Sequence, residues 1–345
     1  MKPVFGPDLY KNIIREYGYE DSFFEGFTKS IDNFTASDLQ RVFLCHTGLY
    51  EFDKAPYNQK VITTGLGLSG VPHIGTLSQI YRLSLLKKSG YNVQLVLGDL
   101  DAYNGKNVSM KRVDELAAKY ENFIQRTGLL DASETTIVRR QKDAFNVLRT
   151  SYLLGRFVDD TDFENANEHI HSFYVDNGKV DEDMSYRRKL SLMLMLADFF
   201  DIGQKYPNVL VMLGVDEHQY VRVGQGLSKK VDEKESGLTP VHIASIYTPI
   251  INGLDGYPKM SKSFPGSSID LAMDPEAIRS KITEQKPSEL GVLHDTVFQM
   301  ICAIGLGEPI ELSEVEKAFS NPAEWDVMKE KLANHIIHYA EAWQQ

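Results

Sequence analysis

The chain has 345 residues, of which 42% are hydrophobic and 25% are charged, so it is long enough to bury one large core. Its 37 basic and 48 acidic residues give a net charge of −11, which argues against nonspecific nucleic-acid binding and limits any RNA contact to a local surface. Two distant cysteines exclude a disulfide framework, and no stretch approaches the roughly 18 apolar residues of a membrane span, so we expect a cytoplasmic protein without membrane contact.

Regular alternation of strands and helices begins after an N-terminal extension, residues 1–58, which mixes short helical patterns with aromatic residues. Residues 60–64 have the composition of a strand, and the glycine-rich residues 65–70 predict a turn. Apolar side chains then recur on one helical face from residue 77 to residue 85. A second strand, residues 93–97, is apolar enough to be buried on both faces. This order predicts a βαβ unit.

Two more buried strands, residues 209–213 and 241–245, are each followed by turn residues and helical patterns. Strands that alternate with helices are typical of an α/β fold, so we predict a doubly wound parallel sheet of the Rossmann type within residues 59–272. Acidic residues gather near 156–190, which indicates a surface insertion. Residues 273–345 have almost only helical patterns and predict a helical C-terminal domain.

The turn after the first strand is a candidate phosphate site, because parallel sheets bind ligands beyond the carboxyl ends of their strands. It contains Gly65 and Gly67, followed by His73, Gly75 and Thr76 at the predicted helix start. Free backbone N–H groups and the helix dipole favour phosphate there, so His73 is placed to contact a phosphate oxygen. Taken alone, a histidine at a helix start is more often a cap or a surface residue.

A second candidate phosphate site is the turn-rich loop that follows the last predicted strand, residues 253–263. The ammonium groups of Lys259 and Lys262 can neutralise the charge that develops on a pyrophosphate leaving group. Their neighbours in the loop are Met260, Ser261 and Ser263. The alternative explanation is a solvated loop that binds no ligand.

The two candidate sites together resemble the signature motifs of class I aminoacyl-tRNA synthetases. His73-Ile-Gly75 is similar to the HIGH motif, with Thr76 in place of the second histidine, and Lys259-Met-Ser-Lys-Ser263 is similar to the KMSKS motif. The resemblance covers most of the chain and narrows to the tryptophanyl and tyrosyl branch.

This resemblance implies a ligase that joins an aromatic amino acid to tRNA with ATP and Mg²⁺, and it implies a homodimer. His73, Lys259 and Lys262 would be catalytic at the phosphates. We expect ATP oxygens to hold the metal, because the sequence shows no dedicated cluster of metal ligands.

A third element follows the strand at 209–213 and resembles the Gly-x-Asp-Gln segment that contacts the ATP ribose and the substrate amino group in this family. It contains Gly214 and Asp216, but Glu217 replaces the glutamine. A carboxylate can pair with the α-ammonium group of an amino acid. The resemblance therefore assigns Gly214 and Asp216 to the nucleotide and Glu217 to the amino acid.

The resemblance also bears on the choice of amino acid. Archaeal tyrosyl enzymes carry a tyrosine in the first turn, where this chain has Leu66, and a Tyr-x-x-x-Gln-x-x-Asp pattern, where it has Ser191, Met195 and Asp198. Met195-Leu-Ala-Asp198 instead resembles bacterial tryptophanyl enzymes, in which methionine packs on the indole and aspartate accepts its N–H. One carboxylate in an apolar pocket suits indole, which is only a donor, so we predict tryptophan. On spacing alone, Met195 is an ordinary core residue.

Three alternatives stay open. Tyrosine is the alternative amino acid, and a paralogue that adenylates an aromatic amino acid without charging tRNA is suggested by Glu217 and by Gly224-Gln-Gly226, where relatives often carry Arg-Asp. The third alternative is a catalytically silent RNA-binding or regulatory relative, against which the intact His73, Lys259 and Lys262 argue. Basic clusters offer local RNA contacts, although solvated helix faces are the commoner explanation; they lie at residues 139–142, 187–189 and 229–230.

Overall fold

The computed structural model describes residues 5–23, 27, 29–32, 34–131, 133–164, 171–179, 184–264 and 266–345. Within the predicted insertion near 156–190, residues 165–170 and 180–183 lie outside the described residues. In the described ranges, no helix combines the length and the apolar character that crossing a membrane would require.

The centre of the molecule is a six-stranded sheet in the order β1-β6-β5-β2-β3-β4. The strands are β1 (Cys45–Thr47), β2 (Lys60–Gly67), β3 (Val93–Gly98), β4 (Thr136–Arg140), β5 (Asn208–Gly214) and β6 (His242–Thr248). Strands β2 to β6 run parallel, and β1 pairs antiparallel with β6 at one edge. The predicted doubly wound α/β sheet is confirmed, with an edge strand supplied by residues 1–58.

The first parallel strand is longer than predicted. Residues 65–67 of β2 pair in parallel register with residues 96–98 of β3, so the turn predicted for residues 65–70 begins only at Leu68. Glycines often mark turns. Pairing at the centre of the sheet overrides that local preference here, and it carries the backbone of Gly65 and Gly67 to the end of the strand.

Helices surround this sheet. They are α1 (Pro7–Tyr17), α2 (Ala36–Val42), α3 (Leu49–Lys54), α4 (Ile74–Lys88), α5 (Asp99–Gly105), α6 (Met110–Thr127), α7 (Phe145–Leu154), α8 (Asp160–Glu164), α9 (His171–Asp176), α10 (Tyr186–Gly203), α11 (His218–Lys230), α12 (Glu233–Ser236), α13 (Pro275–Thr283), α14 (Thr296–Ile304), α15 (Leu312–Ala318) and α16 (Pro322–Gln344). The C-terminal helical part starts at α13, where Pro275 occupies the first turn and Asp274 caps the helix by accepting a hydrogen bond from the Glu276 N–H at 2.9 Å.

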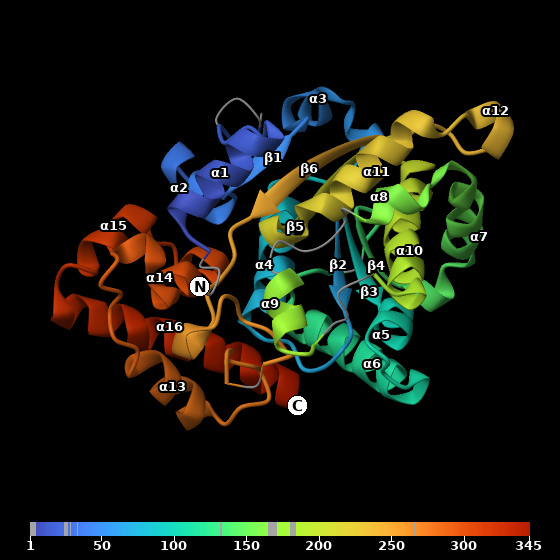
Figure 1. Ribbon diagram of the computed structural model, residues 1–345. Helices are drawn as coiled ribbons and strands as arrows, with labels where there is room; N and C mark the ends of the chain where they lie inside the picture. Colours follow the sequence, from blue (N-terminus) through green and yellow to red (C-terminus); the bar gives the residue numbers. More distant parts are fainter. Residues whose placement is uncertain are drawn as a thin grey trace.

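Successive strand residues point to opposite faces, so the sheet is packed between two hydrophobic clusters. Ile62 and Leu210 belong to the cluster that includes residues of α4, α6 and the C-terminal helices. Val61 and Val209 belong to the cluster that includes residues of α1, α7, α10 and α11. Figure 1 shows the C-terminal helices gathered on one side of the molecule, away from α7 and α10, with the sheet between them.

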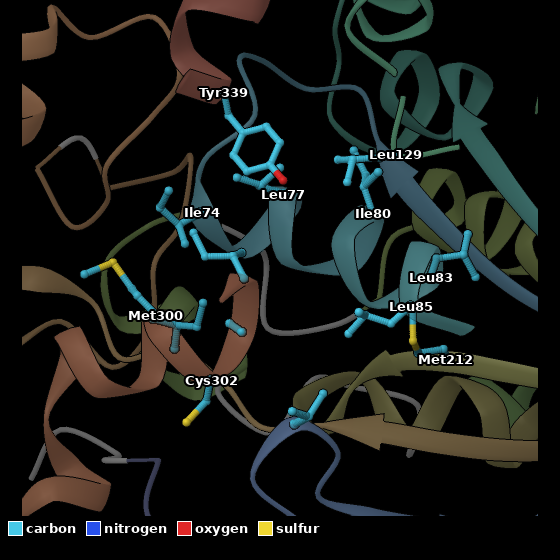
Figure 2. Packing of buried hydrophobic residues seen from close by; sticks show 14 of the residues in the cluster. Ile74, Leu77, Ile80, Leu83, Leu85, Leu129, Met212, Met300, Cys302 and Tyr339 are labelled. Atoms are coloured by element: carbon cyan, nitrogen blue, oxygen red, sulfur yellow. The ribbon is translucent and has the colours of Figure 1, made fainter. Parts of the chain in front are cut away.

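Helix α4 joins the sheet to the C-terminal helices. Its residues Ile74, Leu77 and Ile80 share one buried cluster with Met300 of α14 and Tyr339 of α16 (Figure 2). Residues are buried all around α4, as expected of a helix packed on both sides. This packing fixes the first turn of α4 at the carboxyl edge of the sheet.

Candidate active site

A cavity of about 770 Å³ opens beyond the carboxyl ends of β2, β3 and β5, between the first turn, the loop at 253–263 and α10. Parallel sheets bind ligands at this edge. The site residues assigned from the sequence all line it, namely Gly65, Leu66, Gly67, His73, Gly75, Thr76, Met195, Asp198, Gly214, Asp216, Glu217, Lys259, Met260, Ser261, Lys262 and Ser263. Folding therefore brings these distant segments of the chain to one place.

The first turn presents His73 at the start of α4. The Thr76 and Leu77 N–H groups donate to the His73 carbonyl oxygen at 2.8 and 2.9 Å, which begins the helix. The imidazole lies against Gly75, where an added Cβ atom would come within 2.8 Å of Cε1 of His73. Glycine is therefore needed at position 75 so that the ring can keep its place.

The His73 ring is neutral at physiological pH. Burial, assisted by the nearby ammonium groups of Lys262 and Lys259, lowers the pKa of His73 to about 3. Its Nδ1 atom is buried and has no hydrogen-bond partner among the described residues. A neutral imidazole can donate one hydrogen bond, so in the free protein this ring offers a phosphate oxygen an uncharged donor.

The loop at 253–263 is held against the first turn. A Cβ atom at Gly253 would lie 2.7 Å from the carbonyl oxygen of Lys259, so the loop can fold back this closely only at a glycine. Just beyond the loop, the Ile269 carbonyl oxygen accepts a hydrogen bond from the Ile74 N–H at 3.1 Å. The segment that follows the loop is thus hydrogen-bonded to the first turn of α4.

Lys259, the first loop lysine, is paired with a carboxylate. Its Nζ atom lies 2.5 Å from Oδ2 of Asp216, which belongs to the short 3-10 helix η4 (Val215–Glu217) after β5. The Asp216 carboxylate also packs on Gly214, where a Cβ atom would lie 2.5 Å from Oδ1. The predicted ribose ligand and the predicted phosphate ligand therefore neutralise each other in this state.

Lys262, the second loop lysine, contacts uncharged groups. Its Nζ donates to the Gly67 carbonyl oxygen at 3.2 Å and to the Tyr120 hydroxyl at 3.3 Å. Burial, assisted by the charge of Lys106, lowers the pKa of Lys262 to about 8. A cation in this position gains a counter-charge when an anion enters the cavity.

The face of α10 toward the cavity carries the residues predicted to select the amino acid. Ser191, Met195 and Asp198 follow one another at intervals of four and three residues, which places them on one side of the helix. All three line the cavity, as does Leu66 of β2. An apolar surface and one carboxylate therefore border the same space.

The surroundings of Asp198 are more polar than predicted. Its Oδ1 accepts a hydrogen bond from Nη2 of Arg139 at 3.1 Å, and its Oδ2 accepts one from Nε2 of Gln141 at 2.8 Å. Burial raises the pKa of Asp198 to about 6, whereas Arg139 and Gln141 act to lower it. The prediction of a lone carboxylate in an apolar pocket needs this correction, because the end of β4 brings a cation and an amide to it.

Two polar residues that line the cavity, Gln141 and Asp101, were not predicted as site residues from the sequence. Gln141 is 3% exposed, and its Oε1 accepts a hydrogen bond from the Asp101 N–H at 3.1 Å. Both follow a parallel strand closely, which is the position from which side chains reach ligands. The sequence showed this position for Asp101, because an apolar strand precedes it. It did not show the position for Gln141, because β4 ends in two arginines and does not have the apolar composition of a buried strand.

Most members of the three basic clusters pair inside the molecule. Arg139 pairs with Asp198 and Asp201, Arg140 with Glu121, Lys142 with Asp114, Lys189 with Asp160, and Lys230 with Asp162. These pairs favour the interpretation of the clusters as structural or solvated faces. Arg187 and Arg188 differ from the others because they line the cavity.

Known proteins share this sequence pattern. The family model described as "tRNA synthetases class I (W and Y)" matches residues 58–342. The chain is similar to the tyrosine–tRNA ligase of Methanocaldococcus jannaschii, with 24% identity over 265 residues that cover 75% of this chain and 76% of that protein. It is also similar to the tryptophan–tRNA ligase of Aeropyrum pernix, with 22% identity over 288 residues that cover 79% of this chain and 71% of that protein. In several other curated relatives, the match spans about half of their length.

A solved structure shares the fold. The tryptophanyl-tRNA synthetase from Giardia lamblia matches with a TM-score of 0.70 at 17% identity, over 98% of this chain and 94% of that chain. The curated relatives carry tyrosine and tryptophan names at similar identity. The comparisons therefore do not separate the two amino acids.

Proposed function

The chain belongs to the family of class I tRNA synthetases for tryptophan and tyrosine, and we propose that it activates tryptophan with ATP and transfers it to tRNA. The observation that carries the proposal is that His73, Lys259 and Lys262 line the same cavity as Met195 and Asp198. Class I synthetases use ATP, and the reaction requires the phosphate and the amino acid to meet within bonding reach. One cavity with both kinds of residue supports this proposal.

The proposed reaction has two steps. The carboxylate of tryptophan attacks the α-phosphate of ATP, and the adenylate forms as the bond to pyrophosphate breaks. A terminal ribose hydroxyl of tRNA then attacks the carbonyl carbon of the adenylate, and AMP leaves. Neither step needs a covalent bond to the enzyme, so the protein contributes positioning and charge stabilisation.

We assign the phosphates to His73 as a neutral donor and to the two loop lysines as cations. Asp216 would accept hydrogen bonds from the ribose, and Lys259, which pairs with it here, would move to the phosphates. Mg²⁺ would be held mainly by phosphate oxygens of ATP and would supply positive charge to the reacting phosphates. Within the described ranges, no group of three or more His, Cys, Asp or Glu side chains is placed to hold a metal ion.

Tryptophan is favoured by the α10 face. Met195 offers a thioether to the indole ring, and Leu66 places an apolar side chain at the carboxyl end of β2. An ionised carboxylate has about four lone-pair sites, so Asp198 can accept the indole N–H beside Arg139 and Gln141. Glu217, which lines the same cavity, would pair with the α-ammonium group.

Tyrosine remains the second candidate because of the polar groups around Asp198. A phenol hydroxyl both donates and accepts hydrogen bonds. Asp198 could accept from it, and the donors Arg139 and Gln141 lie close by. The relative from Methanocaldococcus jannaschii is itself a tyrosine–tRNA ligase.

ATP–pyrophosphate exchange with the purified protein tests the choice. We expect exchange that depends on tryptophan, with tyrosine a poor substrate, and equal or faster exchange with tyrosine would overturn the preference. Asp198→Ala should weaken tryptophan binding by about 1–3 kcal/mol, because the buried indole donor loses its acceptor. Calorimetric titration measures this loss, and an unchanged affinity would remove Asp198 from the pocket.

Charging of purified tRNA, run beside the exchange assay, tests the acceptor. A synthetase gives both exchange and aminoacyl-tRNA. Exchange without charging would instead indicate the paralogue that passes its adenylate to another acceptor. The absence of both exchange and charging would indicate the silent relative.

A homodimer is proposed with the family, and α7 supplies a candidate surface for it. Phe145, Leu148 and Tyr152 are 79%, 42% and 88% exposed, and their spacing places them on one side of the helix. Exposed apolar stripes of this kind favour contact with a second copy. Tyr152→Asp should shift the sedimentation coefficient toward that of a monomer.

A further inference from the structure

The carboxylate of Asp198 is held from two sides by residues at the end of β4. Arg139 donates to Oδ1 at 3.1 Å and Gln141 donates to Oδ2 at 2.8 Å. The same arginine also binds Asp201 of α10 at 2.7 Å, so its guanidinium bridges two carboxylates on one helix. A guanidinium presents its donors in a fixed plane, which restricts the orientation of the groups that it binds.

Arg139 and its neighbour Arg140 have different surroundings because side chains alternate along a strand. Arg140 pairs with Glu121 of α6, a carboxylate whose side chain is 41% exposed. Arg139 points the other way, to Asp198, whose side chain is only 4% exposed. Of these two adjacent arginines, one supports a surface pair and the other supports the buried carboxylate of the amino-acid pocket.

We propose that Arg139 is a positioning residue for amino-acid recognition, because it keeps the Asp198 carboxylate ionised and fixed as the hydrogen-bond acceptor of the pocket. The inference rests on the proposed function, and it holds for an indole N–H and for a phenol O–H alike. Gln141 and Asp198 line the cavity. Arg139 is not among the residues that line it and contacts the cavity through its hydrogen bond to Asp198.

The charge of Asp198 is what Arg139 preserves. Burial favours the neutral carboxylic acid, which presents one fewer acceptor and a hydroxyl that repels a donor. The charged groups that face Asp198 are Arg139 from β4 and Asp201 from its own helix, and neutral Gln141 adds a hydrogen bond. Arg139 and Gln141 lower the pKa of Asp198, whereas Asp201 raises it. Substitutions at Arg139 and Asp201 should therefore act in opposite directions.

The test is the pH dependence of the KM for tryptophan in ATP–pyrophosphate exchange, between about pH 5 and 8.5. In the wild type, KM should rise as the pH falls through about 6, where Asp198 takes up a proton. In Arg139→Gln this rise should begin at a higher pH, so that KM at pH 7 increases about tenfold and recovers toward pH 8.5. In Asp201→Asn the rise should move to a lower pH. The value of kcat at saturating tryptophan should change less than KM in both variants.

Two controls separate positioning from folding. Arg140→Gln removes the adjacent arginine without touching Asp198 and should leave the pH profile unchanged. The analogue 3-(benzothiophen-3-yl)alanine has sulfur in place of the indole N–H. Its KM should therefore be the same in the wild type and in Arg139→Gln. If tyrosine proves to be the substrate, phenylalanine serves as the matched analogue without a donor.

The outcomes are distinct. A KM raised equally at every pH, or raised for the sulfur analogue as well, would give Arg139 a structural role and overturn the inference. A normal profile in both Arg139→Gln and Asp201→Asn would also overturn it, while leaving the proposed function intact. Should the wild type show no exchange with either amino acid, the proposed function fails first and the inference with it. If Arg139→Gln does not fold, Arg139→Lys keeps the positive charge but loses the planar guanidinium that contacts both carboxylates. The rise of KM should then begin at a pH between those of the wild type and a variant without the charge, and a wild-type profile in Arg139→Lys for both tryptophan and the sulfur analogue would overturn the inference.

Discussion

Two lysine–aspartate pairs lie at opposite ends of the parallel strands, and their surroundings differ. Lys60 begins β2 and pairs with Asp53 at 3.3 Å, with 6% and 1% of the two side chains exposed. The hydroxyl of Tyr91 donates to the same Asp53 at 2.6 Å. Lys259 pairs with Asp216 at 2.5 Å beyond the carboxyl end of β5, and this pair borders the cavity.

The difference shows how the place of an ion pair in the sheet decides its use. Lys60 and Asp53 are packed among aromatic side chains on fixed elements, so the pair serves folding. Lys259 belongs to a loop beside a cavity, and Asp216 is the residue to which the family resemblance gives the ribose. A pair in that position can exchange its partner for a substrate, which a fully packed pair cannot do without unfolding.

The largest effect should come from breaking the packed pair. Asp53→Ala leaves the ammonium group of Lys60 buried without its counter-charge, which typically costs about 3–5 kcal/mol of unfolding free energy. Urea denaturation measures this loss. The adenylation rate of the protein that remains folded should stay near that of the wild type.

The matched control is Asp114→Ala. Asp114 pairs with Lys142, and their side chains are 43% and 31% exposed, so its removal should cost only about 0–1 kcal/mol. If Asp53→Ala cost no more unfolding free energy than this control, the buried pair of Lys60 with Asp53 would not stabilise the fold more than an exposed pair does.

The second effect belongs to the loop and should appear in the rate. In the proposed reaction, Lys262→Ala removes a cation beside the departing pyrophosphate, where negative charge develops. It should therefore slow adenylate formation about 10²–10³-fold, or roughly 2.7–4 kcal/mol. ATP binding and the unfolding free energy should change much less. Single-turnover kinetics with varied ATP separate the rate from the binding.

Lys229→Ala, at an exposed position near the end of α11, provides the control for removing a lysine as such. It should leave the adenylation rate within about threefold of wild type, a difference of roughly 0.6 kcal/mol. A Lys262→Ala rate in that same range would make the loop a surface feature and would remove the strongest support for the proposed chemistry.

Much of the fold could be predicted because its signals are local. A few neighbouring residues are enough to predict the apolar strand at 93–97 and the start of α13 at its proline. β4 could not be predicted in this way, since its two terminal arginines are satisfied by carboxylates of α6 and α10. Partners that are distant in sequence made a polar segment into a strand.

The candidate site shows the same limit. His73, Lys259 and Lys262 belong to short motifs, so they could be placed before the structure, and they do line one cavity. The pairing of Lys259 with Asp216 and of Asp198 with Arg139 depends on long-range packing, and no spacing in the sequence indicates it. The gathering of these residues at one cavity was therefore predictable, but their ion pairs and charge states were not.

The smallest effect concerns the charge state of Lys262. It tests the difference between the packed pair of Lys60 with Asp53 and the lysines of the loop, because a lysine at the cavity should titrate near neutral pH. Burial, assisted by Lys106, lowers the pKa of Lys262 to about 8, so the free enzyme loses this positive charge as the pH rises through that value. The ratio kcat/KM for ATP reports the free enzyme. It should therefore fall above about pH 8, by roughly tenfold for each further pH unit.

Bound ATP supplies negative charge next to Lys262 and favours its charged form, so kcat at saturating ATP should stay constant to a higher pH than kcat/KM does. Lys262→Arg keeps a charge at every accessible pH, because arginine does not deprotonate in this range. Its absolute rate should be lower, since a guanidinium is larger than an ammonium group, but the fall of kcat/KM above pH 8 should disappear. Stopped-flow adenylation across the pH range checks this. If the fall persists in Lys262→Arg, another group is titrating, and Lys262 is not the cation that meets the phosphates.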